Sequence, residues 1–207
     1  MIEGKNGLRI SDLTHYSRME NENMRDDEMN KIFYLDKDTY HIHMNGRPIN
    51  PKNLVQDTLL TLQPRHCYCI CLSSRGNDAE LYREFKADIC IAFDVDELIN
   101  RIRTFNQRFK GTLVVGRDVN YYRRGIGPSS LDPMDLVFYK PDGFSHEAEY
   151  RIALFYPLDK AGFKYAGGVM PFYKEGESMH MFLSHKRSEF ITSCIKDVVR
   201  LSDITSL

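Results

Sequence analysis

The chain has 207 residues, enough for one substantial hydrophobic core, and no shift in composition divides it, so we predict a single domain over residues 1–207. Hydrophobic residues make up 42% of the chain and charged residues 28%, with 12 Tyr and 12 Phe, which excludes a disordered or low-complexity protein. The formal net charge of −1 gives no overall field that attracts a polyanion or an anionic membrane, so a nucleic-acid partner would need a local basic patch.

The sequence lacks the signals of export and of disulfide or zinc chemistry. No apolar run approaches the roughly 20 residues that span a bilayer, and residues 1–5 lack the apolar region of a signal peptide, so we expect a cytoplasmic protein with no membrane partner. The cysteines are odd in number and contain no Cys-x-x-Cys pair. We interpret all five as core thiols: Cys67, Cys69, Cys71, Cys90 and Cys194.

The first third of the chain predicts short strands, a loop and one helix. Residues 8–10 and 13–17 predict a short extended segment, and residues 18–31, rich in Glu, Asn, Asp and Met, predict a mobile loop with one helical turn. The apolar runs 32–35 and 39–44 predict a hairpin, and the dipeptide Asn45-Gly46 that follows is a strong turn signal. Asn50-Pro51 then predicts the start of a helix that ends at Pro64. The apolar face of that helix would be formed by Leu54, Val55, Leu59 and Leu62.

The middle of the chain predicts two buried strands and two helices. Both faces are apolar over residues 66–72, which is typical of a central strand. Residues 75–78 form a turn that caps a short helix over residues 79–85, and residues 89–93 form a second buried strand. Asp94 or Asp96 caps a longer helix that ends at Lys110-Gly111. Its apolar face contains Leu98, Ile99, Ile102, Phe105 and Phe109.

The last part of the chain adds more strands. Residues 112–116 predict a strand that continues toward Tyr122, residues 123–130 a loop, and residues 144–156 a further strand. Short strands over residues 169–173 and 179–183 follow a loop at residues 162–168, and then a helix over residues 188–199 and a final strand. Because strands outnumber helices in an irregular order, we predict an α+β fold with a mixed or mostly antiparallel sheet and flanking helices.

Residues 144–151 carry the most distinctive side chains. On an extended chain, Glu147, Glu149 and Arg151 project to one side, and the residues between them project to the other. The predicted strand therefore has one charged face and one that can be buried. A solvated edge strand with a ladder of ion pairs is the plain interpretation of this pattern.

Three other patterns could carry chemistry, and we predict that none of them does. His41 and His43 share a strand face and could bind a metal with His180 or His185, but no HExxH motif or acidic cluster adds a ligand, so we predict no metal site. A cysteine nucleophile near His66 conflicts with the burial predicted for that strand. The segment 123–127, Arg-Arg-Gly-Ile-Gly, could bind phosphate but lacks the context of a known phosphate loop.

Three distant segments together resemble a known family. They are Leu13-Thr14-His15-Tyr16-Ser17, the strand that ends in Ser73-Ser74, and Glu147-Ala148-Glu149-Tyr150-Arg151. In this order they resemble an uncharacterised family of bacterial and phage-borne domains with a C-terminal Glu-x-Glu-Tyr-Arg motif. That family is in turn similar to the ADP-ribosyltransferase superfamily. The similarity covers roughly residues 13–151, and its most specific part is Glu-x-Glu-Tyr-Arg.

The resemblance implies an enzyme that cleaves NAD, as its substrate, and transfers ADP-ribose to a macromolecular acceptor. It implies that His15 binds the ribose and diphosphate of NAD, that Tyr16 is a further NAD-binding residue, and that Ser73 or Ser74 supports the ribose and nicotinamide. Glu149 would hold the nicotinamide ribose hydroxyl, and Glu147 would orient or deprotonate the acceptor. Carboxylates suit this chemistry because loss of nicotinamide builds positive charge on the ribose carbon.

The resemblance also implies a biological setting. The chain would be a toxin or a phage-defence effector with a protein or nucleic-acid acceptor and an antitoxin or immunity partner. The middle motif, Leu-Ser-Ser-Arg-Gly, departs from the Ser-Thr-Ser of the toxins, and Arg151 could neutralise Glu149. The alternative is therefore a catalytically inactive binding or regulatory protein with the same fold. If a nucleic-acid face exists, its candidate residues are Arg117, Arg123, Arg124 and Lys140.

Overall fold

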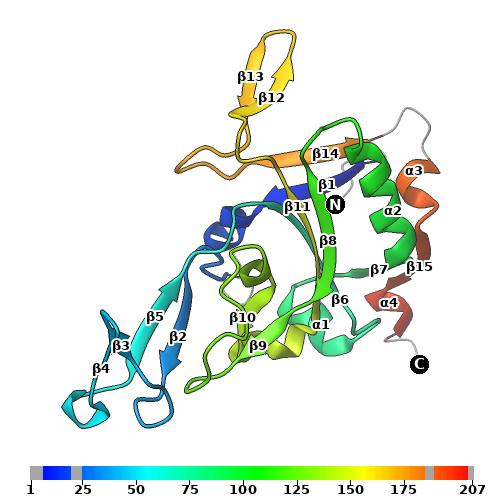
Figure 1. The fold of residues 1–207 in the computed structure, drawn as a ribbon. Helices are drawn as coiled ribbons and strands as arrows, with labels where there is room; N and C mark the ends of the chain where they lie inside the picture. Colours follow the sequence, from blue (N-terminus) through cyan, green and yellow to red (C-terminus); the bar gives the residue numbers. More distant parts are fainter. Residues whose placement is uncertain (1–6, 20–24, 185–188, 205–207) are drawn as a thin grey trace.

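A five-stranded antiparallel sheet forms the centre of the protein, in a computed structural model that describes residues 7–19, 25–184 and 189–204 (Figure 1). The strands, in spatial order, are β14 (His180–Ser184), β1 (Gly7–Asp12), β6 (Tyr68–Ser73), β11 (Glu149–Phe155) and β8 (Leu113–Asp118). With the α-helices that surround it, this sheet gives a mixed α+β chain with mostly antiparallel strands, as the sequence predicted. Among the described residues, no helix has both the length and the apolar character needed to cross a membrane.

Strand β6 lies in the middle of this sheet because both of its faces are apolar. Tyr68 and Ile70 project into one hydrophobic cluster, and Cys67 and Cys69 into a second cluster on the opposite face. This alternation confirms the predicted central strand. Three of the five cysteines are buried, Cys71 and Cys90 are half-buried, and all are free thiols.

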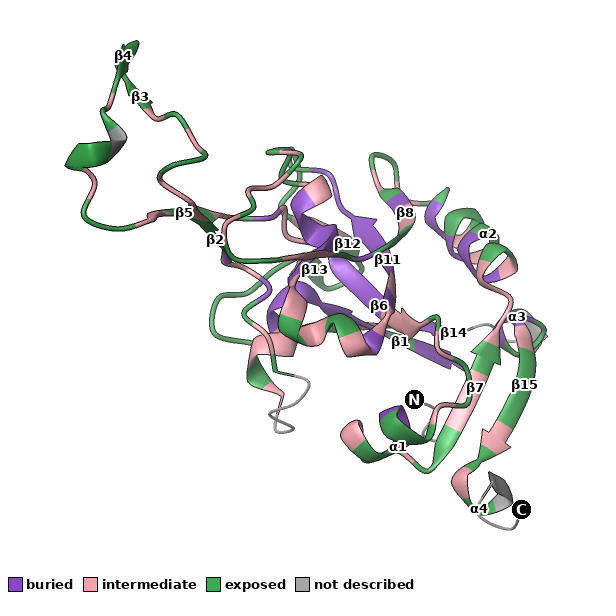
Figure 2. Cartoon of the chain, turned by 90° about the horizontal axis from the view of Figure 1, so that it is seen from below, coloured by how far each residue is buried: buried purple, intermediate pink, exposed green. Residues whose placement is uncertain are grey.

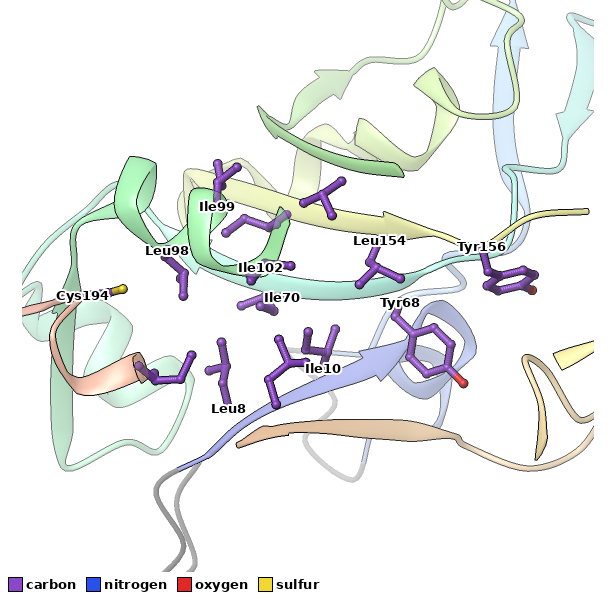
Figure 3. Close-up of a cluster of buried hydrophobic side chains, with 14 of the residues drawn as sticks. Leu8, Ile10, Tyr68, Ile70, Leu98, Ile99, Ile102, Leu154, Tyr156 and Cys194 are labelled. Atoms are coloured by element: carbon purple, nitrogen blue, oxygen red, sulfur yellow. The ribbon is translucent and has the colours of Figure 1, made fainter. Parts of the chain in front are cut away.

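Helix α2 (Val95–Asn106) covers the first face of the sheet (Figure 3). The side chain of Asp94 caps it by accepting a hydrogen bond from the amide of Glu97, as predicted. The helix approaches β8 closely at Gly116, where an added Cβ atom would lie 2.5 Å from Cδ1 of Ile99. The remaining α-helices of the described chain are short: α1 (Ala79–Glu84), α3 (Glu189–Thr192) and α4 (Leu201–Ile204).

Two 3₁₀ helices cover the second face of the sheet. They are η1 (Leu13–Arg18) and η4 (Asp135–Phe138), which contribute Leu13, Val137 and Phe138 to the second cluster. The prediction of an extended segment over residues 13–17 is therefore wrong. The chain turns there because the buried carboxylate of Asp12 accepts hydrogen bonds from the amide and hydroxyl of Thr14, which starts the helical turn.

The part of the chain that follows η1 and precedes β6 in sequence forms a long arm, which projects from the sheet. Most of its residues are exposed (Figure 2). The arm consists of β2 (Lys31–Leu35) and β5 (Thr58–Leu62), the small hairpin of β3 (His43–Met44) and β4 (Arg47–Pro48), and the 3₁₀ helix η3 (Pro51–Asn53). The Asn45-Gly46 turn is confirmed, since both residues have positive φ and join β3 to β4.

Two predictions for this arm are wrong. Strand β2 pairs with β5 and not with residues 39–44, and the predicted helix up to Pro64 is limited to η3 followed by β5. The reason is the alternation in β5, where Leu60 and Leu62 pack against Phe33 while Leu59 is exposed. These leucines therefore follow the two-residue period of a strand, although their spacing also fits a helix.

Three further strand pairs lie around the central sheet. They are β7 (Ile89–Phe93) with β15 (Ile195–Arg200), β9 (Asn120–Tyr122) with β10 (Tyr139–Pro141), and β12 (Gly162–Tyr165) with β13 (Gly168–Pro171). Three predictions fail here. Residues 162–168 form part of a hairpin and not a loop, strand β7 is only partly buried, and the C-terminal helix stops at Thr192, with β15 and then α4 following it. Residues 20–24 of the predicted mobile loop lie outside the described chain.

Candidate active site

The Glu-x-Glu segment lies at the junction between a 3₁₀ helix and the strand that pairs with β6 and β8 in the central sheet. Glu147 ends the helix η5 (Asp142–Glu147), Ala148 has a left-handed backbone with φ of 42°, and Glu149 begins β11. The prediction that Glu147, Glu149 and Arg151 share one strand face is therefore wrong for Glu147. The face shared by Glu149 and Arg151 is also not solvated, because both side chains are buried.

The end of β6 holds this junction in place. Ser73 lies opposite Glu149 in the strand register, and its hydroxyl donates to the carbonyl of Glu147 at 2.6 Å. The hydroxyl and amide of Ser74 both donate to the carbonyl of Ala148. The guanidinium of Arg75 donates to the carbonyl of His146 at 2.7 Å. Three successive residues thus bind three successive carbonyls, which stabilises the left-handed conformation of a residue other than glycine.

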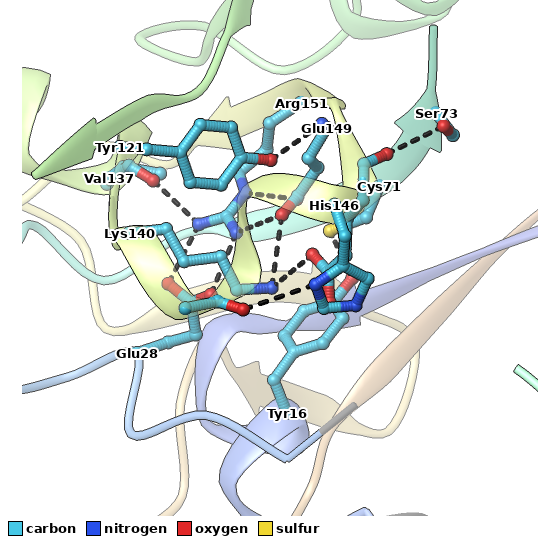
Figure 4. A network of polar contacts seen from close by, with 12 residues as sticks. Tyr16, Glu28, Cys71, Ser73, Tyr121, Val137, Lys140, His146, Glu149 and Arg151 are labelled. Carbon is cyan, nitrogen blue, oxygen red and sulfur yellow. Dashed lines mark hydrogen bonds and ion pairs between the residues drawn. The ribbon is translucent and has the colours of Figure 1, made fainter. Parts of the chain in front are cut away.

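Arg151 is the centre of a buried network of charges (Figure 4). Its Nε and Nη2 donate to the two carboxylate oxygens of Glu149 at 2.8 and 3.0 Å. Its Nη1 and Nη2 donate to the two oxygens of Glu28, both at 2.8 Å, and Nη1 also donates to the carbonyl of Val137 at 2.6 Å. All five N–H groups of this fully buried guanidinium are therefore used, with a bidentate geometry on each carboxylate.

Two buried lysines complete the network. Nζ of Lys31 lies 2.5 Å from Oε2 of Glu28. Nζ of Lys140 lies 2.6 Å from Oε2 of Glu147 and 3.3 Å from Oε2 of Glu149, and 4.5 Å from the centre of the Phe144 ring. Three carboxylates and three cations thus balance in charge, as they must when ions are removed from water.

The two glutamates differ in proton affinity although one ammonium group contacts both. Burial raises the pKa of Glu147 above its ordinary value, and Lys140 opposes this shift only in part. Burial would also raise the pKa of Glu149, but the charges of Arg151 and Lys140 outweigh it, and the pKa is lowered. Glu149 therefore remains ionised, while Glu147 can exchange a proton closer to neutral pH.

Both carboxylates line a small cavity of about 170 Å³ at the end of β6 and β11. Its other lining residues include Tyr16, Met19, Cys71, Ser73 and Phe85. A second cavity of about 460 Å³ adjoins it, since the two share Cys71, Leu72, Ser73 and Phe85. The larger cavity is lined mainly by residues of α1 and β7 and of the turn between β6 and α1. Together they form a cleft with the carboxylates at its narrow end.

The structure brings together most of the predicted site residues. Tyr16, Ser73, Glu147 and Glu149 line the small cavity, and Ser74 lines the adjoining one. His15 lines neither cavity. Burial, followed by the charge of Arg9, lowers the pKa of His15, which also lies within the electrostatic reach of His180.

Sequence reasoning missed three members of the network: Glu28, Lys31 and Lys140. Lys140 was assigned to an exposed nucleic-acid face, and this is wrong because its ammonium group is buried between Glu147 and Glu149. A usable signal was the Glu28-x-x-Lys31 spacing directly before an apolar strand. The other members of that predicted face are exposed and paired with carboxylates, in Arg117–Asp135, Arg123–Asp142 and Arg124–Asp57.

The other chemical patterns do not form sites in the described chain. Burial raises the pKa of the Cys69 and Cys71 thiols well above the ordinary value, which disfavours the thiolate. The amides of Gly125 and Gly127 already donate to Tyr34 and Tyr40 and are not free for phosphate. No group of three or more His, Cys, Asp or Glu side chains suited to a metal occurs in the described ranges, and His185 lies outside them.

Comparisons of the chain with known protein families, with curated proteins and with solved structures found no match.

Proposed function

We propose that the chain is an ADP-ribosyltransferase-like enzyme that binds NAD in this cleft and transfers ADP-ribose to a protein or nucleic-acid acceptor. The observation that carries the proposal is the pair of glutamates in one cavity, with pKa values shifted in opposite directions. In glycosidases, pairs of carboxyl groups that differ in this way divide the work of bond cleavage: the ionised one stabilises the developing cation, and the one with the raised pKa donates or accepts the proton.

The size of the cleft fits this substrate. The narrow cavity of about 170 Å³ is too small for a dinucleotide but is large enough for part of one, and the adjoining cavity adds about 460 Å³. The nicotinamide ribose would therefore lie beside Ser73 and the two glutamates. The adenosine would extend over the largely apolar wall formed by α1 and β7.

In the proposed reaction, the bond between the ribose carbon and the nicotinamide nitrogen breaks, and nicotinamide leaves with the electron pair. The ionised carboxylate of Glu149 stabilises the positive charge that develops on the ribose. A nucleophilic atom of the acceptor forms the new bond to the ribose carbon. Its proton passes to Glu147, whose raised pKa suits a general base.

Nicotinamide release from NAD by the purified chain, with protein or RNA acceptors present, tests the proposal. We expect Glu147→Gln to reduce the rate at least about 100-fold, since general base catalysis typically contributes this much. Glu177→Gln, which changes an exposed glutamate paired with Lys174, is the matched control and should retain full activity. Absence of turnover by the wild-type chain with every acceptor class would contradict the proposal.

A binding or regulatory protein without turnover is the second candidate. It is favoured because the carboxylate of Glu149 already accepts hydrogen bonds from two cations. Arg151 and Lys140 already donate three charge-assisted hydrogen bonds to this carboxylate, so its charge is largely neutralised. Calorimetric binding of NAD with no release of nicotinamide would support this function. The proposed biological role, as a toxin or phage-defence effector with an immunity partner, applies only if turnover occurs.

A further inference from the structure

We propose that another cavity, at the opposite end of the sheet from the cleft described above, binds a nucleotide, either free or as a unit of single-stranded nucleic acid. This basic–aromatic cavity has a volume of about 740 Å³. It is formed by the turn from α2 to β8, the connection from β11 to β12, and the base of the β12–β13 hairpin. Its charged and aromatic lining residues are Arg108, Phe109, Lys110, Asp159, Lys160, Phe163, Lys164 and Phe172.

The location separates this cavity from the cleft described above. Strand β11 begins at Glu149 and ends at Phe155, two residues before the Pro157 that lines the basic–aromatic cavity. Seven extended residues span roughly 20 Å, so the two sites lie at opposite ends of one strand. Figure 1 shows the β12–β13 hairpin projecting from this end of the sheet.

The charges of the cavity favour an anion. Four exposed cations line it, at positions 108, 110, 160 and 164, against the single carboxylate of Asp159. Within the described chain, no ion pair joins any of these four to a carboxylate, whereas Arg117, Arg123 and Arg124 each have an acidic partner. Such a cluster of unpaired cations is the local basic patch that a near-neutral chain needs to attract phosphate groups.

The aromatic side chains give the cavity a surface for a base. Phe109 and Phe163 are half-buried and stand edge to face, with ring centres 5.2 Å apart, and Phe163 packs in the same way on the buried Phe172 at 4.7 Å. The rings are thus held in position but not fully covered. Phenyl rings next to cations are the combination that binds nucleotide units, through stacking and phosphate contacts.

Two contacts between loops fix the shape of the cavity. Nζ of Lys160 donates to the carbonyl of Lys110 at 3.0 Å, which ties the β11–β12 connection to the α2–β8 turn. At Gly111, whose φ is 85°, an added Cβ atom would lie 3.0 Å from Cβ of Pro157. Two chain segments that are far apart in sequence therefore form one rim before any ligand binds.

Fluorescence anisotropy with a labelled single-stranded RNA of about 12 nucleotides tests the proposal. Neutralising four phosphates predicts a slope of log affinity against log salt of about −2.8 for the wild type. The double variant Lys110→Gln/Lys164→Gln removes two of the four cations, so we expect this slope to fall by about half and the affinity to fall at least 10-fold at low salt. Competition by AMP distinguishes a site for free nucleotides, where AMP displaces the RNA, from a site for strands, where it does not.

Arg123→Gln/Arg124→Gln is the matched control, because it removes the same charge from exposed arginines that already have acidic partners. It should leave RNA affinity unchanged. Phe163→Leu should weaken RNA binding about 5-fold or more without weakening the binding of inorganic polyphosphate, with Phe109→Leu as the second aromatic variant. Failure of the wild type to bind RNA or AMP would overturn the proposal, and so would a larger loss in the control than in the lysine variant. NAD turnover should be the same in all these variants, so this test is independent of the proposed enzyme activity.

Discussion

The two ends of strand β11 hold charge in opposite ways. At the Glu149 end, six charged side chains are buried and each has a partner of opposite charge. At the other end, four cations are exposed and none of them forms an ion pair within the described chain. Removing an ion from water costs several kcal/mol unless it is paired, whereas exposed cations are screened and need no partner. Buried charges therefore depend on one another for the stability of the fold, and exposed ones remain available to a ligand.

The strongest test of this difference is Arg151→Met. The substitution leaves the carboxylates of Glu28 and Glu149 buried without the guanidinium that donates hydrogen bonds to both of them. We expect the free energy of unfolding, measured in urea by circular dichroism, to fall by about 3–5 kcal/mol. Arg117→Met is the matched control, because Arg117 lies directly opposite Arg151 in the strand register but is 53% exposed. Its effect should stay below about 1 kcal/mol, and equal effects at the two positions would refute the distinction.

Lys140→Met tests the edge of the buried network. It removes the cation that joins Glu147 to Glu149, but Glu149 keeps the bidentate contact with Arg151. We expect a smaller loss of about 2–3 kcal/mol in urea unfolding. Lys174→Met, which breaks an exposed pair with Glu177, should cost less than about 1 kcal/mol. A loss at Lys140 no larger than this control would mean that Glu147 is not held by the lysine.

The sequence predicted the elements whose patterns are local. The central strand β6, the short helix after Asp78 and the capped helix α2 follow from apolar periodicity and from a capping aspartate. The predictions for the arm and for the C-terminal region were wrong because the same residues fit both a helical and a strand periodicity. Packing partners far away in sequence, such as Phe33 for Leu60 and Leu62, decide which of the two structures forms.

The candidate site was predicted only in part, for a similar reason. Glu147, Glu149 and Ser73 carry the resemblance and lie together in the cavity. Glu28 is 123 residues away from Arg151 in sequence and reaches it only because the chain before β2 passes over the second face of the sheet. The spacing of Glu28 and Lys31 is a local signal for the pair that these two residues form, but nothing in the residues around Glu28 indicates its contact with Arg151.

Asp26 offers a further test of the buried network at the Glu149 end of β11. Here the substitution is expected to raise the free energy of unfolding, by a smaller amount than the other substitutions lower it. Burial and the nearby charge of Glu28 raise the pKa of Asp26 to about 6, and its Oδ2 has no hydrogen-bond partner among the described residues. A carboxyl group with a raised pKa in the folded state destabilises the fold as pH rises from its unfolded pKa to its folded pKa. We therefore expect Asp26→Asn to stabilise the chain by about 2 kcal/mol at pH 7 and to have little effect below pH 4, as measured by urea unfolding across this range. Glu28 and Glu149, whose pKa values are lowered, lose their stabilising contribution only as pH falls below about 4, so the two effects are separable.

The smallest effect on stability should come from the other end of β11. Lys110→Gln/Lys164→Gln removes two exposed cations that have no acidic partner, so nothing buried is left uncompensated. We expect the free energy of unfolding to change by less than about 0.5 kcal/mol, with any gain appearing at low salt, where repulsion among the four cations is least screened. Urea unfolding at low and high salt measures this, with Arg123→Gln/Arg124→Gln as a control that breaks two exposed ion pairs. A destabilisation comparable to that of Lys140→Met would mean that these lysines are part of the folded core, and the two ends of the strand would then not differ as described.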